Sequence, residues 1–286
     1  QATAGGPIPT AGYAIQQAGA VVYDRLVSEE VLGLIPAGCQ CFDVGKSRGR
    51  HSVSQAEIGT LLVQLAQQGL KVVRLKGGDP AIFGRLAEEL DALDNAGISW
   101  QIVPGISAAS GCAAATGIPL TERGIAQQLR FISAVDKNSD TTQDWASLAM
   151  PGQTLVFYMG LAALCEISQQ LMAHGLAPDW PLLLVENGSR PEQRCLLSTL
   201  SAALVDLDGA ATALFSTGLA GVAAFVVVGT FSSEIPFAER IPSFSGNVPG
   251  FGFTNGRALS VFCAVGAAAT AGLAVVTTFS VTVLAP

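Results

Sequence analysis

The sequence predicts an α/β protein made of two successive lobes. Short strands rich in β-branched residues alternate with helix-like stretches at the spacing of a parallel sheet, and a second alternating series follows. One strand runs into Gly77-Gly78-Asp79-Pro80, a turn in which two glycines let the backbone approach a ligand without Cβ atoms in the way. Open α/β sheets hold ligands at the carboxyl ends of their strands, so this turn is a candidate binding loop. Taken alone, the turn is equally well explained as a tight exit from a strand.

The elements of the first lobe follow from local patterns. Strands are predicted at Val21–Tyr23, Cys41–Val44, Val72–Leu75 and Trp100–Val103. Helices are predicted at Ser54–Gln68 and Ile82–Ala96. Ser54 and Glu57 have the spacing of a capping box, which fixes the start of the first of these helices.

A stretch rich in Gly, Ala and Ser, residues 104–119, predicts a hinge between the lobes. The strands of the second lobe are predicted at Leu129–Ser133, Leu155–Tyr158, Leu182–Val185 and Ala223–Val228. We therefore expect an N-terminal α/β lobe over residues 1–112, a C-terminal α/β lobe over residues 113–233, and an atypical apolar extension over residues 234–286.

The composition limits the classes of function. A net charge of −7 and a pI near 4.8 argue against a nucleic-acid partner, which requires a basic face. With 50% hydrophobic and 13% charged residues, the chain can bury a substantial core. The six cysteines include no C-x-x-C pair, so we expect reduced thiols, a cytoplasmic protein and no metal site. The first residues contain no basic segment before a long apolar run, so no secretory signal is predicted.

Six motifs follow one another along the chain: YDRLVS at 23–28, VGK at 44–46, RLKGGDPAIFGR at 74–85, VPGISAASGCAAATGIPLT at 103–121, TLVFYMG at 154–160 and LLVENGSRPEQR at 183–194. In this order they resemble the uroporphyrinogen-III C-methyltransferases of the tetrapyrrole methylase family. The resemblance implies a two-lobed class III methyltransferase fold with the active site in the cleft between the lobes. It also implies S-adenosylmethionine as the methyl donor, S-adenosylhomocysteine as its product, a homodimer, and conversion of uroporphyrinogen III to precorrin-2 on the route to sirohaem or cobalamin.

Two other interpretations stay open. The chain could be a methylase of the same family that acts on a later corrin precursor or another acceptor. It could also be a non-catalytic relative that binds a ligand or a partner. The absent N-terminal loop and a C-terminus unlike the family support the second alternative. TERG at 121–124 and SAV at 133–135 depart from the family pattern in ways that could weaken turnover or shift the acceptor, and Ala81 in place of a Phe removes an aromatic wall beside Ile82.

By resemblance, Asp24 matches the family's proton acceptor and Lys46 its proton donor. Both follow predicted strands, at positions that can face a cleft. Such a pair could move the pyrrole proton while a new C–C bond forms. The competing interpretation is a structural ion pair, or two anchors for substrate carboxylates.

The resemblance also assigns cofactor residues. Backbone groups at the glycines can reach polar atoms of the cofactor, and a methionine offers a soft apolar wall. The assigned residues are Gly77, Gly78, Asp79, Ile82, Ser107, Ala108, Met159 and Gly188. Core packing is the competing interpretation for Met159.

The implied tetrapyrrole substrate carries several carboxylates, which arginine binds in a bidentate manner. The candidate substrate residues are Arg25, Arg48, Arg50, Lys76, Arg85, Arg123, Arg130 and Arg194. Each of them alone is also explained as a solvated surface charge.

Both ends of the chain depart from the family. Before Asp24 there is no counterpart of the family's opening strand and Gly-rich loop, which predicts a gap or an open sheet edge in the first lobe. Residues 258–286 contain no charged residue. We expect this tail to pack on the body of the protein rather than to enter a membrane or to stay ill-ordered. Residues 261–273 weakly resemble the missing strand and loop, so a permuted chain is a further alternative.

Overall fold

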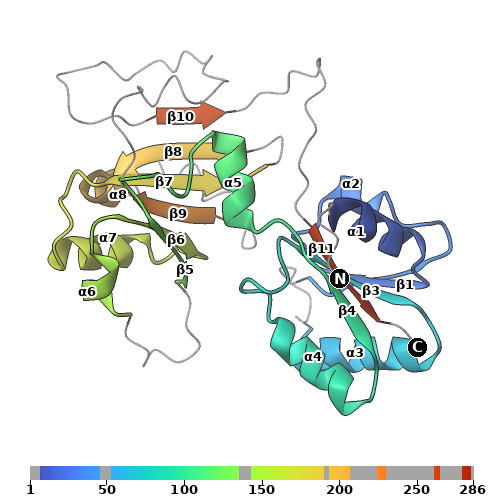
Figure 1. Cartoon of the computed structure of the whole chain (residues 1–286). Helices are drawn as coiled ribbons and strands as arrows, with labels where there is room; N and C mark the ends of the chain where they lie inside the picture. Colours follow the sequence, from blue (N-terminus) through green and yellow to red (C-terminus); the bar gives the residue numbers. More distant parts are fainter. Residues whose placement is uncertain are drawn as a thin grey trace. The chain divides into compact units, whose positions relative to one another are not determined.

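The computed structural model describes residues 7–45, 53–134, 143–189, 193–206, 224–229, 261–264 and 279–284 (Figure 1). The chain divides into two compact units, Gln1–Ala108 with Val276–Pro286, and Ala109–Val275. The boundary predicted after residue 112 lies inside helix α5 (Ala108–Thr116), four residues beyond this division. The predicted extension over residues 234–286 contributes to both units.

The first unit is built on a five-stranded sheet. Its order is β2 (Gln40–Asp43), β1 (Ala20–Tyr23), β3 (Val72–Gly77), β11 (Phe279–Leu284) and β4 (Trp100–Val103). The four strands predicted for the first lobe are therefore present. β1 is parallel to β2 and β3, whereas β11 is antiparallel to both β3 and β4.

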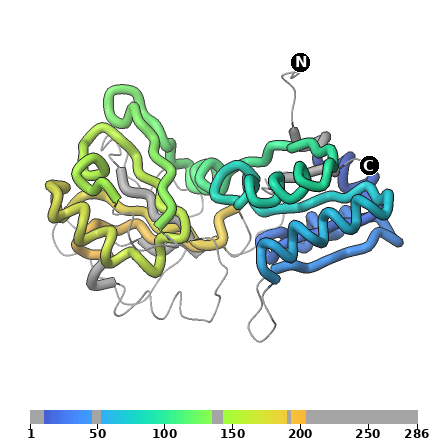
Figure 2. Tube along the Cα trace, turned by 90° about the horizontal axis from the view of Figure 1, so that it is seen from below, coloured from blue at the N-terminus to red at the C-terminus, as the bar shows by residue number. Residues whose placement is uncertain are grey.

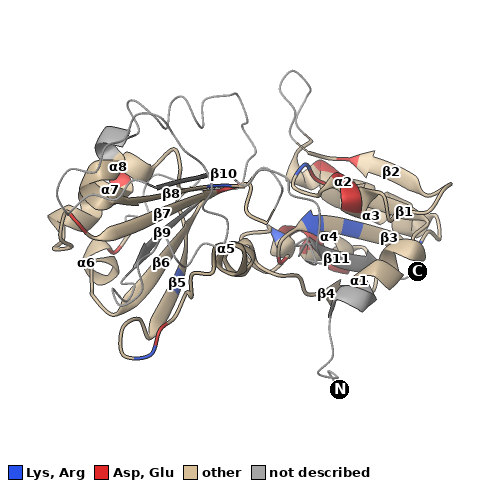
Figure 3. Cartoon of the chain, turned by 90° about the horizontal axis from the view of Figure 1, so that it is seen from above, with Lys and Arg blue, Asp and Glu red and all other residues tan. Residues whose placement is uncertain are grey.

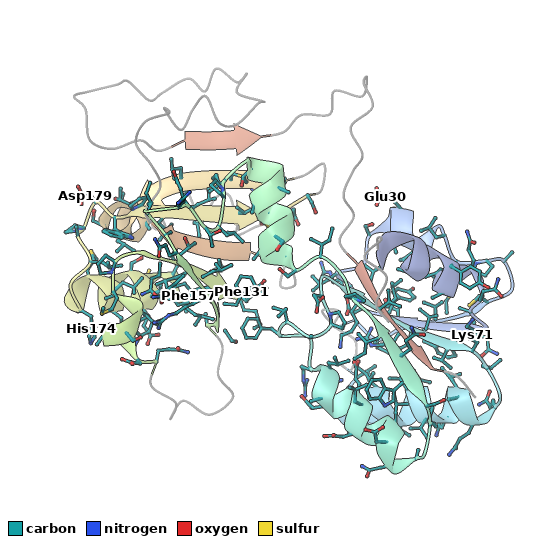
Figure 4. The ribbon with its side chains drawn as sticks, in the orientation of Figure 1. Glu30, Lys71, Phe131, Phe157, His174 and Asp179 are labelled. Atoms are coloured by element: carbon teal, nitrogen blue, oxygen red, sulfur yellow. The ribbon has the colours of Figure 1, made fainter. Side chains whose placement is uncertain are left out.

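Helices cover both faces of this sheet. They are α1 (Pro7–Gln16), α2 (Glu29–Leu32), α3 (Gln55–Gln67) and α4 (Leu86–Asn95). Alternate residues of a strand point to opposite faces. Val73 and Leu75 pack in one cluster with Ile15 of α1, whereas Val72 packs in another with Leu62 of α3. Figure 2 views the face that α3 and α4 cover. Lys71, labelled in Figure 4, precedes β3, and its Nζ lies 5.9 Å from the ring centroid of Tyr13 in α1.

The predicted helix starts are right for α3 and wrong for α4. Ser54 caps α3, and the capping box with Glu57 is formed. α4 begins at Leu86 rather than at Ile82. The reason is that Phe83 and Arg85 have positive φ angles, 50° and 54°, which a right-handed helix does not accommodate.

The second unit contains a six-stranded sheet. Its order is β10 (Val261–Ala264), β8 (Arg194–Thr199), β7 (Pro181–Glu186), β9 (Ala224–Gly229), β6 (Gln153–Tyr158) and β5 (Gln128–Ser133). All four strands predicted for this lobe are present, and β8 and β10 are additional. Only β5 and β6 form a parallel pair of neighbours in this order, so the sheet is mixed.

The core of the second unit lies on one face of this sheet. Helices α6 (Trp145–Leu148), α7 (Leu164–Ala173) and α8 (Leu200–Asp206) contribute Leu148, Leu171 and Leu200 to one cluster with Leu182 and Leu184 of β7. The intervening residues of β7, Leu183 and Val185, instead line a small cavity with α5. Because α5 covers residues 108–116, the predicted hinge over residues 104–119 is largely helical. Alanine, which is frequent here, has the highest helix propensity.

The two described segments of the C-terminal tail are strands paired in the sheets, as expected if the tail packs on the body. β11 fills the place between β3 and β4 in the first sheet, whereas β10 adds to the edge of the second sheet. Residues 261–264 pair with β8 of the second sheet, so they do not supply the missing strand of the first lobe; a different C-terminal segment, β11, lies in the first sheet. Within the described ranges, no helix has the length and apolarity needed to cross a membrane.

Candidate functional site

The loops that follow β1, β2, β3 and β4 leave the first sheet at one edge. β1 is parallel to β2 and β3, and β3 and β4 are both antiparallel to β11. Therefore β1, β2, β3 and β4 all run in the same direction. The segments after Tyr23, Asp43, Gly77 and Val103 therefore begin at the carboxyl edge, where open α/β sheets bind ligands. Four of the motifs found in the sequence lie here.

Glycines bring these loops into direct contact. A Cβ atom on Gly77 would lie 2.6 Å from Cβ of Leu26, and one on Gly45 would lie 2.8 Å from the backbone nitrogen of Arg25. Both distances are too short for a side chain. The loop after β1 therefore packs on the loops after β2 and β3, and only glycine allows the approach.

Asp79 connects the loop after β3 to the loop after β4. Its Oδ1 accepts a hydrogen bond from the backbone nitrogen of Ala81 at 2.8 Å. Its Oδ2 accepts one from the backbone nitrogen of Gly105 at 3.2 Å. This carboxylate therefore shapes the binding loop through backbone contacts.

Gly78 lies against the start of α5 with a φ of 86°, and a Cβ placed on it would be 3.8 Å from the backbone nitrogen of Ala108. Ile82, further along the same loop, is half-buried. The structure thus brings together the cofactor candidates of the first unit: Gly77, Gly78, Asp79, Ser107 and Ala108.

Backbone strain coincides with the predicted motifs. Phe83 and Arg85 follow the Gly-Gly-Asp turn, Met159 follows β6 with a φ of 60°, and Asn187 and Ser189 follow β7 with φ angles of 53° and 64°. Over the described ranges, these are all the non-glycine residues with positive φ. Such strain is uncommon and concentrates at functional sites. The coincidence favours binding loops over plain strand exits.

Asp24, the predicted proton acceptor, lies directly after β1. Its Oδ1 accepts from the backbone nitrogen of Leu26 at 3.0 Å, and its Oδ2 lies 3.5 Å from Nη2 of Arg74. The Asp24 side chain is 24% exposed, so the carboxylate is held but accessible. Its predicted partner Lys46, together with Arg48 and Arg50, lies outside the described residues.

Lys76, a predicted substrate residue, is buried within the first unit. Its Nζ donates to Oε2 of Glu89 at 3.0 Å and to the backbone oxygen of Gly84. Burial lowers the pKa of the Lys76 ammonium, and the neighbouring Glu89 carboxylate opposes that shift. A substrate carboxylate could reach Lys76 only by displacing these contacts.

The other basic candidates fall into two groups. Arg85 pairs with Glu88, Arg130 donates to Oγ of Ser147 at 2.7 Å, and Arg194 pairs with the buried Glu186. The hydrogen bonds that Arg85 donates to the Glu88 carboxylate raise the pKa of Arg85. The second group consists of the exposed Arg25 and Arg123.

In the second unit, Met159 and Gly188 follow β6 and β7. Met159 is 50% exposed, so it is not a core residue here.

A Cβ on Gly188 would clash with Sγ of Cys112 in α5. Burial raises the pKa of the Cys112 thiol to about 12, so this sulfur is a neutral packing group. The Tyr158 hydroxyl accepts from the backbone nitrogen of Ala109 at 3.3 Å, which fixes the start of α5 near the end of β6.

Sequence reasoning missed Arg74 and Glu89. Arg74 is 4% exposed and Glu89 is 2% exposed, and Arg74 Nε lies 3.1 Å from Glu89 Oε1. A signal was present: two cations two residues apart in the apolar run Val72–Gly77 point to the same face of a strand and need a buried acid. Figure 3 shows the basic residues of β3 in blue.

Comparison with known proteins identifies the family and the fold. The profile of the tetrapyrrole (corrin/porphyrin) methylases matches residues 10–204. Siroheme synthase 3 of Aeromonas hydrophila is 52% identical over 187 residues, which make up 65% of this chain and 40% of that protein. The chain thus spans well under half the length of this curated relative.

Two solved structures resemble the protein. Uroporphyrin-III C-methyltransferase from Thermus thermophilus, complexed with S-adenyl homocysteine, is 33% identical with a TM-score of 0.60, and the match covers 77% of this chain and 90% of that one. A cobalt precorrin-4 methyltransferase is 23% identical with a TM-score of 0.64, covering 76% of this chain and 86% of that one, and supports the fold alone. The predicted class III methyltransferase fold is confirmed.

Proposed function

This chain belongs to the tetrapyrrole (corrin/porphyrin) methylase family, and from that premise we propose that it methylates carbon atoms of uroporphyrinogen III with S-adenosylmethionine. The product would be precorrin-2, on the route to sirohaem or cobalamin. The main supporting observation is the convergence of the loops after β1, β2, β3 and β4 at the carboxyl edge of the first sheet. Strained, glycine-dependent loops at this edge are where such folds hold ligands.

The residues of the first unit fit the proposed cofactor. The Gly-Gly-Asp turn and residues 105–108 gather backbone polar groups in one place, and the half-buried Ile82 adds an apolar surface. We propose that Gly77, Gly78, Asp79, Ile82, Ser107 and Ala108 hold S-adenosylmethionine. Met159 and Gly188 stay predicted cofactor residues on the family resemblance. When bound, this cofactor supplies an electrophilic methyl group and leaves as S-adenosylhomocysteine.

The acceptor has to lose a proton when a carbon of its ring gains a methyl group. We propose that the Asp24 carboxylate takes this proton, since it is held at both oxygens yet partly exposed. Lys46 is proposed as the proton donor. Among the basic residues, we propose that the exposed Arg25 and Arg123 anchor substrate carboxylates, and Arg48 and Arg50 stay predictions. Arg85, Arg130 and Arg194 stay candidates for the same role.

Two finer proposals rest on the family resemblance. We propose that the protein is a homodimer and that it acts in the cytoplasm. Light scattering at micromolar concentration tests the first, and a monomer would contradict it.

The proposed function is tested by calorimetric binding of S-adenosylhomocysteine, followed by a methyl-transfer assay on uroporphyrinogen III. Asp24→Asn should lower turnover by ~10²–10⁴-fold, the usual contribution of a general base, without changing cofactor affinity. Asp91→Asn, an exposed carboxylate of α4, is the matched control and should retain parental turnover. Binding without turnover in the parent protein would favour the non-catalytic alternative, and turnover only on a later precursor would favour the other methylase.

A further inference from the structure

Four side chains of the first unit form a partly buried ionic network beside the proposed site. Arg74 and Lys76 are adjacent cations on one face of β3, Asp24 follows β1, and Glu89 lies in the first turns of α4. If all four are ionised, the formal charges cancel. This balance explains how two cations are tolerated inside β3, whose other residues are Val, Leu and Gly.

Glu89 anchors this network. Its Oε1 accepts from Arg74 Nε at 3.1 Å and from Gln55 Nε2 at 3.0 Å, and its Oε2 accepts from Lys76 at 3.0 Å. With three donors and 2% exposure, the Glu89 carboxylate is fixed in position.

Arg74 alone among these donors extends from Glu89 to Asp24. Its Nη1 donates to the backbone oxygens of Leu75 at 2.8 Å and Val22 at 3.4 Å, and its Nη2 lies 3.5 Å from Asp24 Oδ2. The planar guanidinium is thus held by β1, β3 and α4 before it meets Asp24.

The geometry points to Arg74 as a positioning residue for Asp24. Resting on the proposed role of Asp24 as proton acceptor, the inference is that Arg74 transmits the fixed position of Glu89 to the Asp24 carboxylate. Oδ1 is held by the Leu26 nitrogen and Oδ2 by Arg74, so the carboxylate keeps one orientation toward the acceptor. Orientation of this kind changes the rate of the chemical step more than it changes binding.

A kinetic double-mutant cycle tests this inference. Arg74→Gln should lower kcat by roughly 10- to 100-fold, with the Kd for S-adenosylhomocysteine unchanged. In the Asp24→Asn background, the same substitution should change kcat less than about twofold, because its target is already lost. If Arg74→Gln lowers kcat by the same 10- to 100-fold in the Asp24→Asn background, the inference is overturned. It is also overturned if folded Arg74→Gln keeps the parental kcat.

Two further variants separate positioning from stability. Gln55→Leu removes another donor to Glu89 without touching Asp24, and it should lower Tm while kcat stays parental. An equal loss of kcat in Gln55→Leu would overturn the specific role of Arg74. If Arg74→Gln fails to fold, Arg74→Lys replaces it in the double-mutant cycle. Lysine keeps the positive charge but lacks the planar guanidinium that contacts both Glu89 and Asp24, so the same changes in kcat are expected. If Asp24→Asn keeps parental turnover, the proposed role of Asp24 fails, whatever Arg74 does.

Discussion

The first unit holds its candidate site loops by contacts between loops, whereas the second unit holds its own through backbone conformation and packing on α5. At the edge of the first sheet, Asp79 binds Gly105, and Gly77 packs on Leu26. In the second unit, the backbone of Met159 adopts a left-handed conformation directly after β6, and Gly188 packs on Cys112. Substitutions in the first unit should therefore affect neighbouring loops together, whereas those in the second unit should act locally.

The C-terminal tail shows the same contrast. β11 pairs over six residues with β3 and over four with β4, so it lies in the interior of the first sheet. β10 pairs over four residues with β8 at the edge of the second sheet. One strand completes a sheet and the other only extends one.

Replacing each strand with Gly/Ser residues of the same length gives the largest expected difference. Without β11, β3 and β4 would stand ~10 Å apart, twice the normal strand spacing, with no partner between them. We expect a loss of at least ~4 kcal/mol, a large part of the ~5–15 kcal/mol by which ordinary domains are stable. Replacing β10 should cost only about 1–2 kcal/mol, because edge pairing is lost on one side. Thermal unfolding measures both, and similar Tm values for the two variants would contradict the interior role of β11.

Gly78→Val gives the next largest effect and tests the binding loop of the first unit. Gly78 has a φ of 86°, so valine would be strained by about 1–2 kcal/mol. Gly69→Val is a matched control, because Gly69 has a φ of 77° with no atom near its Cβ position and lies in the turn before β3. Both variants should lose similar stability, but only Gly78→Val should weaken S-adenosylhomocysteine binding, by at least ~10-fold or 1.4 kcal/mol. Equal affinities in the two variants would remove Gly78 from the cofactor site.

How much the sequence could predict differs between local and distant structure. The strands of the first lobe were predictable because β1 and β3 are nearly continuous apolar runs, and α3 because Ser54 and Glu57 mark its start. β11 was not assigned as a strand, and residues 261–273 were taken only as a weak counterpart of the first lobe's missing strand. The pairing of both strands depends on segments far away in the chain. The late start of α4 was missed because a positive φ at Phe83 and Arg85 has no residue signature.

The candidate site was predictable at the level of loops but not of contacts. The Gly-Gly-Asp turn marked the right strand end, and the structure places residues 105–108 beside it. The burial of Lys76 and Arg74 was not foreseen, although their spacing in β3 indicates that both need a buried acid. The sequence alone does not show which acid this is, because Glu89 lies in α4, beyond the loop.

The most local predicted effect tests the second unit, where packing on Cys112 explains why position 188 is a glycine. A methyl group on Gly188 would point at Sγ of Cys112, so Gly188→Ala should overpack this contact and cost about 1–3 kcal/mol. Adding Cys112→Ala removes the sulfur, and the nearest remaining atoms would lie at 3.4 and 3.6 Å, which is ordinary contact. The double variant should then match the stability of Cys112→Ala alone within about 0.5 kcal/mol. Because the added methyl points toward α5, affinity for S-adenosylhomocysteine should recover as well, with the backbone of Gly188 still available to the cofactor. A double variant as unstable as Gly188→Ala would show that the clash is not the cause, and one that is stable but binds weakly would show that the cofactor needs glycine itself at this position.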